Sequence, residues 1–302
     1  MAVMTTEPPP SATRPLTAES QGEKNMASLF FLVLLWLSLA FGILVLIVLI
    51  VTTFIDGLPR MDSKLFTNYA SQINPEDAGA RAAILGTLWV IATTAVLAIP
   101  IGIAAAAYLE EFASKTSRFA HIVELNVQNL AAVPAILYGM LAAAAALAIG
   151  LPRNTVLAGG IALALLILPV VIVATREALR AVPQEIRQGS LALGASPMQT
   201  LQRQTLPAAI PGIATGTILA LSRAMGEAAP LLLLGGLVFV KFDPNGLLSG
   251  FTTMPIQIFD WAGRSQEEFQ QLAAAASILL LVMVIALNGL AIIIRNKFTL
   301  AR

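Results

Sequence analysis

The chain has 302 residues, of which 57% are hydrophobic and only 12% charged, with a formal net charge of +1. A soluble domain carries roughly twice that charged fraction, and one water-soluble core of this length cannot bury so much apolar surface. The composition therefore argues against a soluble enzyme, a disordered chain and a nucleic-acid binder. The chain has no cysteine and one histidine, His121, which excludes disulfides, thiolate metal sites and multi-histidine metal sites.

The chain begins with a polar segment that is followed by a long apolar run. Residues 1–27 include three consecutive prolines and predict a disordered tail. The run that follows, 29–54, carries no charge and is too long for the apolar part of a signal peptide. We therefore expect a retained membrane anchor with an external loop over 28–80, and a membrane core over 81–302.

Apolar runs recur along the whole chain. Four of them contain no charged residue: 29–54, 83–109, 155–175 and 272–294. Two more, 122–149 and 208–240, are interrupted by polar residues and prolines. About 20 helical residues cross a hydrocarbon core of ~30 Å, and in lipid each span must satisfy its own backbone hydrogen bonds. The sequence therefore predicts an all-α integral membrane protein with six transmembrane helices.

Lysine and arginine are unequally distributed between the connections. When the N-terminus is placed in the cytoplasm, 11 of them lie inside, 6 lie outside, and Arg223 lies within a span. Because positive residues accumulate in cytoplasmic loops, we expect both termini in the cytoplasm.

Two charges lie deep within the fifth apolar run. Arg223 and Glu227 are four residues apart, so a single helix would present both on one face, together with Gly216 and Ala220. A charged side chain at membrane depth costs ~2.5–3.5 kcal/mol on insertion scales, so we expect this pair to face water or a partner. A guanidinium on an aqueous path suits an anion, because its planar donor fork matches carboxylate, sulfate or phosphate oxygens. We predict a substrate path at these four residues.

A buried ion pair that only fixes helix packing is the alternative. Gly212 and Gly216 have the spacing that lets transmembrane helices approach closely. In the transport interpretation, Glu227 holds the Arg223 fork and limits its affinity for the anion, so that the anion can leave.

The connection over about 183–207 is too long for a simple turn between two spans. Pro183 suits the first position of a helix, and Gly194 can end that helix because glycine tolerates the left-handed conformation. Ser196 can cap a second helix, with Gln199 closing a capping box.

This second helix is expected to end at Leu206 and Pro207, before the fifth span. Two short helices joined by a glycine form a cytoplasmic protrusion that can dock into a partner's groove. Packing of the loop on its own bundle is the alternative.

The same connection resembles the cytoplasmic coupling loop of ATP-binding-cassette (ABC) importer permeases. The family pattern is E-A-A, three residues, glycine, nine residues and I-x-L-P, and Gly194, Leu206 and Pro207 are in register with it. The sequence departs from the pattern at 188–190, where E-A-A is usual, and at Gln204, where isoleucine is usual. The resemblance implies an ATPase-coupling role for Ser190, Leu193, Gly194, Ala195, Ser196, Leu206 and Pro207.

Longer motifs are more specific. The segments NLAAVPAILYGM (129–140), SRAMGEAAPLLLLGG (222–236), MPIQIFDWA (254–262) and ALNGLAIIIRNKF (286–298) resemble the A-type permeases of phosphate-specific ABC importers. The resemblance covers roughly 81–302. It implies a type I importer permease core with one extra N-terminal helix, in the bacterial plasma (inner) membrane, and it places Arg223 and Glu227 on the family's charged path motif.

The resemblance also implies partners. These are a homologous C-type permease subunit, two copies of an ATPase subunit, a periplasmic phosphate-binding protein and membrane lipid, with no nucleic acid. The chain lacks a G-x-x-x-x-G-K-S/T nucleotide loop, so ATP and Mg are expected on the partner ATPase. We therefore expect no enzyme activity, cofactor or metal on this chain.

Other functions remain open at this stage. The substrate can be another oxyanion such as sulfate. A secondary anion carrier would also place an arginine in a broken helix. A non-transporting membrane scaffold that senses phosphate status could use the same cytoplasmic loop.

Several weaker signals accompany the main ones. His121 lies near Glu124 and is expected to be an interfacial side chain. Residues 241–270 predict an external interfacial helix that either receives the binding protein or covers the bundle; its apolar members are Ile256, Ile258, Phe259 and Trp261. Three amide side chains are expected either to line the path or to bond neighbouring helices: Asn126, Gln128 and Asn129.

Overall fold

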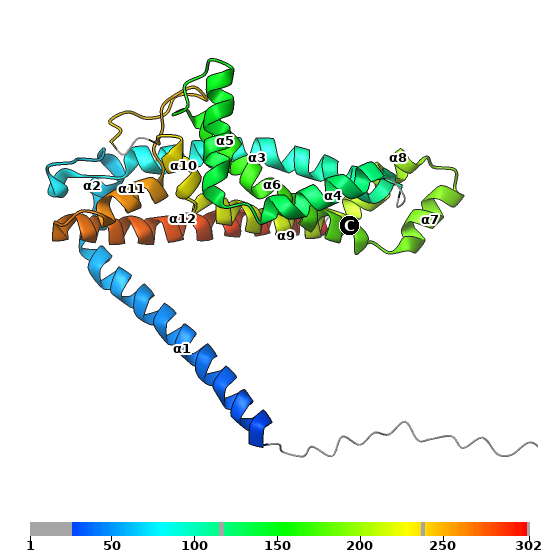
Figure 1. Ribbon diagram of the computed structural model, residues 1–302, viewed down its shortest axis with the longest axis horizontal. Helices are drawn as coiled ribbons and strands as arrows, with labels where there is room; N and C mark the ends of the chain where they lie inside the picture. The colour runs from blue at the N-terminus through cyan, green and yellow to red at the C-terminus, as the bar shows by residue number, and fades with distance from the viewer. Residues whose placement is uncertain (1–25, 115–117, 237–238, 301–302) are drawn as a thin grey trace, which may run out of the picture. The chain divides into compact units, whose positions relative to one another are not determined.

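The computed structural model describes residues 26–114, 118–236 and 239–300, and the chain is predominantly helical there (Figure 1). Within these described ranges, five helices are long and apolar enough to cross a membrane. They are α1 (Met26–Gly57), α3 (Arg81–Ala107), α6 (Val156–Arg180), α9 (Leu206–Met225) and α12 (Glu267–Leu300). The prediction of an all-α membrane protein is confirmed, and the four charge-free runs fall in α1, α3, α6 and α12. The predicted disordered tail, 1–27, lies almost wholly outside the described residues.

The predicted span 122–149 is not one helix. α4 (Arg118–Ala131) ends before Pro134, which precedes α5 (Ala135–Ala148) with φ −55° and ψ 132°. Proline has no N–H with which to continue the hydrogen-bond ladder of α4. Tyr138 bridges the break, because its hydroxyl donates to the carbonyl of Leu130 at 2.5 Å. Where six spans were predicted, the described residues therefore form five long helices and the shorter apolar α5.

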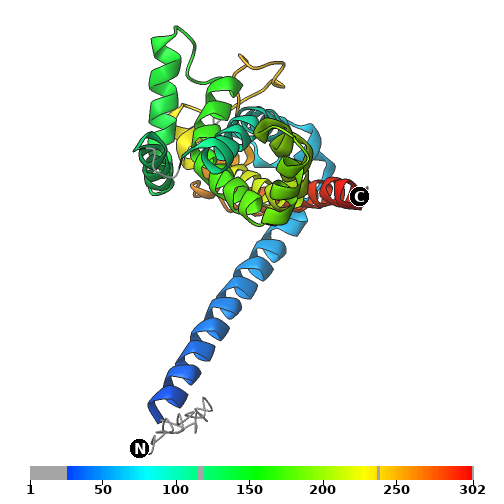
Figure 2. The same cartoon turned by 90° about the vertical axis from the view of Figure 1, so that its right-hand side faces the viewer.

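Four helices, α3, α6, α9 and α12, run side by side, and α5 lies across their direction at one side, packed on α6 and α10 (Figures 1 and 2). Small residues allow the close approach. A Cβ atom on Gly160 of α6 would lie 2.4 Å from the side chain of Thr93 in α3. A Cβ atom on Gly212 of α9 would lie 2.7 Å from the Cβ of Ala178 in α6. Residues 26–51 of α1 belong to a separate unit of the chain.

A second buried cluster lies where α3 and α12 begin. It joins α2 (Ser63–Thr67) and α11 (Met254–Ala262) to the two long helices. The chain reaches α11 through a segment that passes over Gly86 of α3, where an added Cβ would lie 2.0 Å from the Thr252 carbonyl oxygen. The backbone N–H of Met254 then donates to the Thr87 hydroxyl at 2.9 Å. These contacts fix α11 against α3.

The expectation that α11 is a surface helix with its apolar side chains in the membrane interface is therefore wrong. Ile256 and Trp261 are fully buried, Ile258 is partly buried, and only Phe259, at 64%, is strongly exposed. The helical part of this segment packs on the bundle, and its role in receiving the binding protein stays a prediction.

Candidate translocation site and coupling loop

The fifth apolar run breaks beside its two charges. α9 ends at Met225, and α10 (Ala229–Leu233) begins three residues after Gly226. The N–H of Gly226 bonds to the Arg223 carbonyl at 3.2 Å, and Pro230 has no N–H to offer the Gly226 carbonyl. The helix therefore cannot continue through this segment, and the predicted span 208–240 is two helices.

The break separates the two charges. Arg223 lies in the last turn of α9 and is exposed, whereas Glu227 lies in the linker and is partly buried. In the part of the chain that the structure describes, no ion pair or hydrogen bond joins them. The prediction that one helical face carries both residues is therefore wrong, and the reason is the helix end at Gly226.

The small residues of that predicted face pack within the bundle. Ala220 is 1% exposed and belongs to the main core. A Cβ on Gly216 would lie 2.3 Å from the Cβ of Ala174 in α6. This is the close packing that the spacing of Gly212 and Gly216 also predicted. Of the four residues, Arg223 and Glu227 remain the candidates for a path.

The surroundings of the break are built by other elements. A Cβ on Gly139 of α5 would lie 2.2 Å from the carbonyl oxygen of Pro230, so α5 packs directly on α10. On another side, the break borders a largely apolar hollow of about 610 Å³ between α11 and α12. Gly226 and Ala228 line this hollow together with Pro255 and Leu281. The charged linker therefore adjoins open space as well as packed helices.

α9 is held to α12 by two polar contacts. The Ser222 hydroxyl donates to the side-chain oxygen of Asn288, and Arg295 donates to the Thr215 hydroxyl at 3.0 Å. The two contacts are separated by the same number of residues on each helix. Ser222 directly precedes Arg223, so α12 fixes the turn that presents this arginine.

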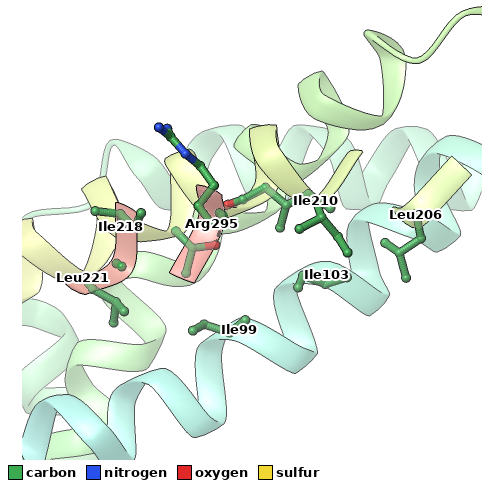
Figure 3. Close-up of a pocket in the computed structure, with 11 residues that line it drawn as sticks. Ile99, Ile103, Leu206, Ile210, Ile218, Leu221 and Arg295 are labelled. Carbon is green, nitrogen blue, oxygen red and sulfur yellow. Dashed lines mark hydrogen bonds between the residues drawn. The ribbon is translucent and has the colours of Figure 1, made fainter. Parts of the chain in front are cut away.

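An apolar groove of about 420 Å³ lies between α9 and α3, and Ala291 and Arg295 of α12 also line it (Figure 3). Ile99 and Ile103 of α3 face Ile210 and Leu221 of α9 across it. α9 is thus tightly packed on α6, bonded to α12 and loosely apposed to α3 along this stretch.

The coupling loop has the two short helices that the sequence predicted. α7 (Gln184–Ala192) ends before Gly194, whose φ is +87°, and Ser196 begins α8 (Pro197–Thr200). The capping box is present, with the Ser196 N–H donating to Gln199 Oε1 at 2.9 Å and the Gln199 N–H donating to Ser196 Oγ at 3.3 Å. Leu193, beside the glycine, is 91% exposed.

Two details of the loop differ from the prediction. Pro183 occupies the N-cap position, one residue before α7 begins at Gln184, rather than the first position of the helix. The second helix does not end at Leu206 and Pro207, because a π-helical turn, Leu201–Thr205, carries it into α9. In this wider turn the Leu206 N–H bonds to the Leu201 carbonyl, which leaves room for the proline ring that follows.

A hollow of about 410 Å³ opens between α7 and the α8 side of the loop. Ser190, Leu193 and Ala195 line it with Gln199 and Arg203. The Ser190 and Thr200 hydroxyls are hydrogen-bonded at 2.9 Å and join the two helices. Most of the predicted coupling residues thus lie around this hollow and the glycine turn, whereas Leu206 and Pro207 begin α9.

A cluster of charges at the base of this loop was not predicted from the sequence. Its members are Glu110, Glu111, Glu124, Arg176, Arg180 and Arg187. They come from the end of α3, from α4, from the end of α6 and from α7. The available signal was the acidic pair that directly follows the charge-free run 83–109, opposite the arginine-rich stretch after 175.

The weaker candidates, His121 and the three amides, all lie in α4. Asn126 is exposed and donates to the carbonyl of Ile122 in its own helix, and Asn129 is exposed. The side chain of Gln128 lies outside the described residues. His121 is exposed, and its predicted neighbour Glu124 is instead paired with Arg176 at 2.9 Å.

Comparison with known proteins decides the family. A model of the family described as "Binding-protein-dependent transport system inner membrane component" matches residues 98–299. The chain belongs to this family. The match covers all the core elements from the second half of α3 onward, including the coupling loop and the break at Arg223.

Curated relatives of this permease cover nearly its full length. The "Phosphate transport system permease protein PstA" of Yersinia pestis is 32% identical over 279 residues, which are 92% of this chain and 93% of the relative. "PstA 1" of Mycobacterium tuberculosis (strain CDC 1551 / Oshkosh) is 31% identical, with 97% and 95% covered. This likeness confirms the resemblance to phosphate-type permeases.

Solved structures show the same fold. A chain of the inward-facing MetNI methionine ABC transporter superposes with a TM-score of 0.57 at 18% identity, covering 72% of this permease and 96% of that chain. A chain of a bacterial ABC transporter that imports the acidic polysaccharide alginate gives 0.52 at 15% identity, covering 87% and 96%. The predicted ABC importer permease fold is confirmed, and a secondary carrier is not favoured.

Proposed function

We propose that this chain is the transmembrane permease subunit of an ABC importer that moves inorganic phosphate into the cytoplasm. Its likeness to permeases named for phosphate transport extends over more than nine-tenths of both chains, and this observation supports the substrate most directly. In the proposed complex it pairs with a homologous C-type permease, two copies of an ATPase subunit and a periplasmic phosphate-binding protein. ATP and Mg bind to the ATPase, and both termini of this chain lie in the cytoplasm.

Arg223 supplies the chemistry for an anion in this proposal. It is an exposed guanidinium in the last turn of a membrane helix, where the helix carbonyls favour a cation. Its planar fork matches two oxygens of a phosphate. Glu227, on the linker after the helix, is the proposed counter-charge near this fork, because a charged residue on a membrane path is favoured when an opposite charge lies close to it.

The coupling loop is the proposed contact with the ATPase. Leu193 protrudes from it, and the hollow beside Ser190, Ala195 and Gln199 offers a mixed polar and apolar surface. Movement of this loop reaches the path directly, because α8 continues through the π-helical turn into α9, which carries Arg223.

The first prediction concerns Arg223. In the complete transporter reconstituted with ATPase and binding protein, Arg223→Gln should reduce ATP-dependent uptake of labelled phosphate by at least ~10-fold, since one charge-assisted bidentate contact is worth more than 1.4 kcal/mol. The uptake rate of Arg223→Lys should lie between those of the wild type and Arg223→Gln, because lysine keeps the charge and loses the planar donor fork. Uptake at the wild-type rate by an assembled Arg223→Gln complex would contradict the proposed site.

The same reconstitution tests the substrate. Labelled phosphate and labelled sulfate are compared at equal concentration, with Lys64→Gln as a control that removes an exposed charge paired with Asp77. Sulfate uptake without phosphate uptake would overturn the substrate while leaving the importer assignment intact. Anion uptake without ATPase or ATP would overturn the importer assignment.

A further inference from the structure

We infer that Glu111 and Arg187 position the coupling helix α7, and that the neighbouring Glu110–Arg176 pair holds the support on which they act. This inference rests on the proposed function, because it assigns the residues through which ATPase movement reaches the transmembrane helices. Neither pair touches the proposed anion path.

The first step is that α7 lacks an apolar anchor. None of its nine residues is buried. An exposed helix this short is unstable by itself, so something other than hydrophobic burial must fix its position. The Ser190–Thr200 hydroxyl contact ties α7 to α8, which leads into α9, but not directly to α3 or α6.

The second step is that Arg187 supplies that link. Its Nη2 lies 2.9 Å from Glu111 Oε1 and donates to the carbonyl of Leu179 at 2.6 Å. Glu111 belongs to the π-helical end of α3, and Leu179 to the last turn of α6, whose carbonyls favour a cation. One guanidinium on α7 therefore holds the ends of two transmembrane helices.

The third step is that the π-helical turn that carries Glu111 is itself held in place by ion pairs. Glu110 accepts from Arg176 Nε at 3.3 Å and from Arg180 Nε at 2.9 Å, and Arg176 also donates to Glu124 in α4 at 2.9 Å. These contacts fix the π-helical turn against α6. Because Glu110 and Glu111 are adjacent, a shift of α7 that pulls on Glu111 acts on the braced turn and thus on α3.

Burial distinguishes these pairs from ordinary surface ion pairs. The side chains of Arg187 and Glu111 are 19% and 17% exposed. The pair of Arg180 and Glu177, whose arginine also holds Glu110, is 46% and 64% exposed. Exposed pairs contribute little, whereas removal of one partner from a mostly buried pair leaves an uncompensated charge. Glu177 therefore offers a matched control.

The functional test measures coupling. Glu111→Gln and Arg187→Gln should each lower phosphate taken up per ATP hydrolysed by at least ~5-fold in the reconstituted complex, and the double variant should lose little more than either single variant because both remove one contact. Glu177→Gln should leave the ratio unchanged. A purely structural role would reduce the amount of assembled complex with an unchanged ratio, and that result would overturn the inference.

A second readout does not depend on the substrate. The chain has no cysteine, so spin labels can be placed at Gln188→Cys on α7 and Val173→Cys on α6 without removing native thiols. Glu111→Gln should broaden the distance distribution between the labels in the complex, and Glu177→Gln should not. An unchanged distribution would overturn the inference even if uptake falls. Failure of the wild-type complex to take up phosphate would overturn the proposed function, and the label distances would still test the positioning role.

Discussion

At the scale of single residues, the charges of this chain form pairs between distant segments. Arg81, at the start of α3, grips Asp243 with Nη2–Oδ2 at 2.6 Å and Nε–Oδ1 at 3.1 Å. The hydrogen bond from Arg81 lowers the pKa of Asp243 below its ordinary value of 3.8, and Tyr69 acts in the same direction. The pair joins the helix start to the segment that leads back toward α11.

The sign of the pH dependence follows from that lowered pKa. A carboxyl whose pKa is lower in the folded chain adds stability above its unfolded pKa, and the contribution is lost as the pH falls through the folded pKa. Asp243→Asn should therefore lower the midpoint of thermal unfolding at pH 7, and the difference from the wild type should shrink once the pH is below 3.8. An equal difference in unfolding midpoint at pH 7 and below pH 3.8 would show that the pairing with Arg81 is not the cause of the destabilisation.

At the scale of elements, the coupling loop depends on local backbone chemistry. Gly194 has φ +87°, and an added Cβ there meets nothing within 4 Å, so a substitution is opposed by backbone strain alone. Gly189 lies within α7 and also has open space around it. The two glycines thus share surroundings and differ in conformation.

This difference gives a matched pair of substitutions. Gly194→Ala should destabilise the local turn by about 1–2 kcal/mol, because the left-handed conformation is costly for a residue with a Cβ. Gly189→Ala should stabilise α7 by about 0.5–1 kcal/mol, because alanine restricts the unfolded chain. Hydrogen exchange of the α7 amides, read by mass spectrometry, should become faster in the first variant and slower in the second. A change of the exchange rate in the same direction in both variants would contradict this account.

At the scale of the whole molecule, the core over 52–302 is held together at one end by a buried cluster that joins α2, α3, α11 and α12. The Trp261 side chain is completely buried, at 0% exposure, whereas Phe259 on the same helix is 64% exposed. The cluster is what closes the chain back onto α3 after the break at Gly226.

Trp261→Ala should destabilise the fold by about 3–5 kcal/mol, the usual cost of truncating a large buried aromatic side chain. Phe259→Ala should change stability by much less, since that side chain is already largely exposed. Thermal unfolding of the purified chain in detergent measures both. Similar losses for the two variants would show that the cluster does not carry the stability assigned to it.

The amino-acid sequence determined the features that depend on local chemistry. Long charge-free runs are stable in a membrane only as helices that satisfy their own backbone hydrogen bonds, so they specified α1, α3, α6 and α12. The glycine at 194 and the Ser196–Gln199 capping box act within one turn of chain, so α7 and α8 were predictable as well. The sequence singled out Arg223 and Glu227 as the deep charges of the fifth run, but it placed them on one helix and did not predict the helix end at Gly226.

Only the tertiary structure decided the features that join distant segments. Arg187 meets Glu111, Gly216 meets Ala174, and Trp261 is buried, because helices far apart in the sequence pack together. Hydropathy cannot tell a membrane-facing apolar residue from a buried one, since both are equally apolar. The sequence likewise does not show which charges pair, because only the fold brings them into contact. The charge cluster at the base of the coupling loop was therefore visible only in the structure.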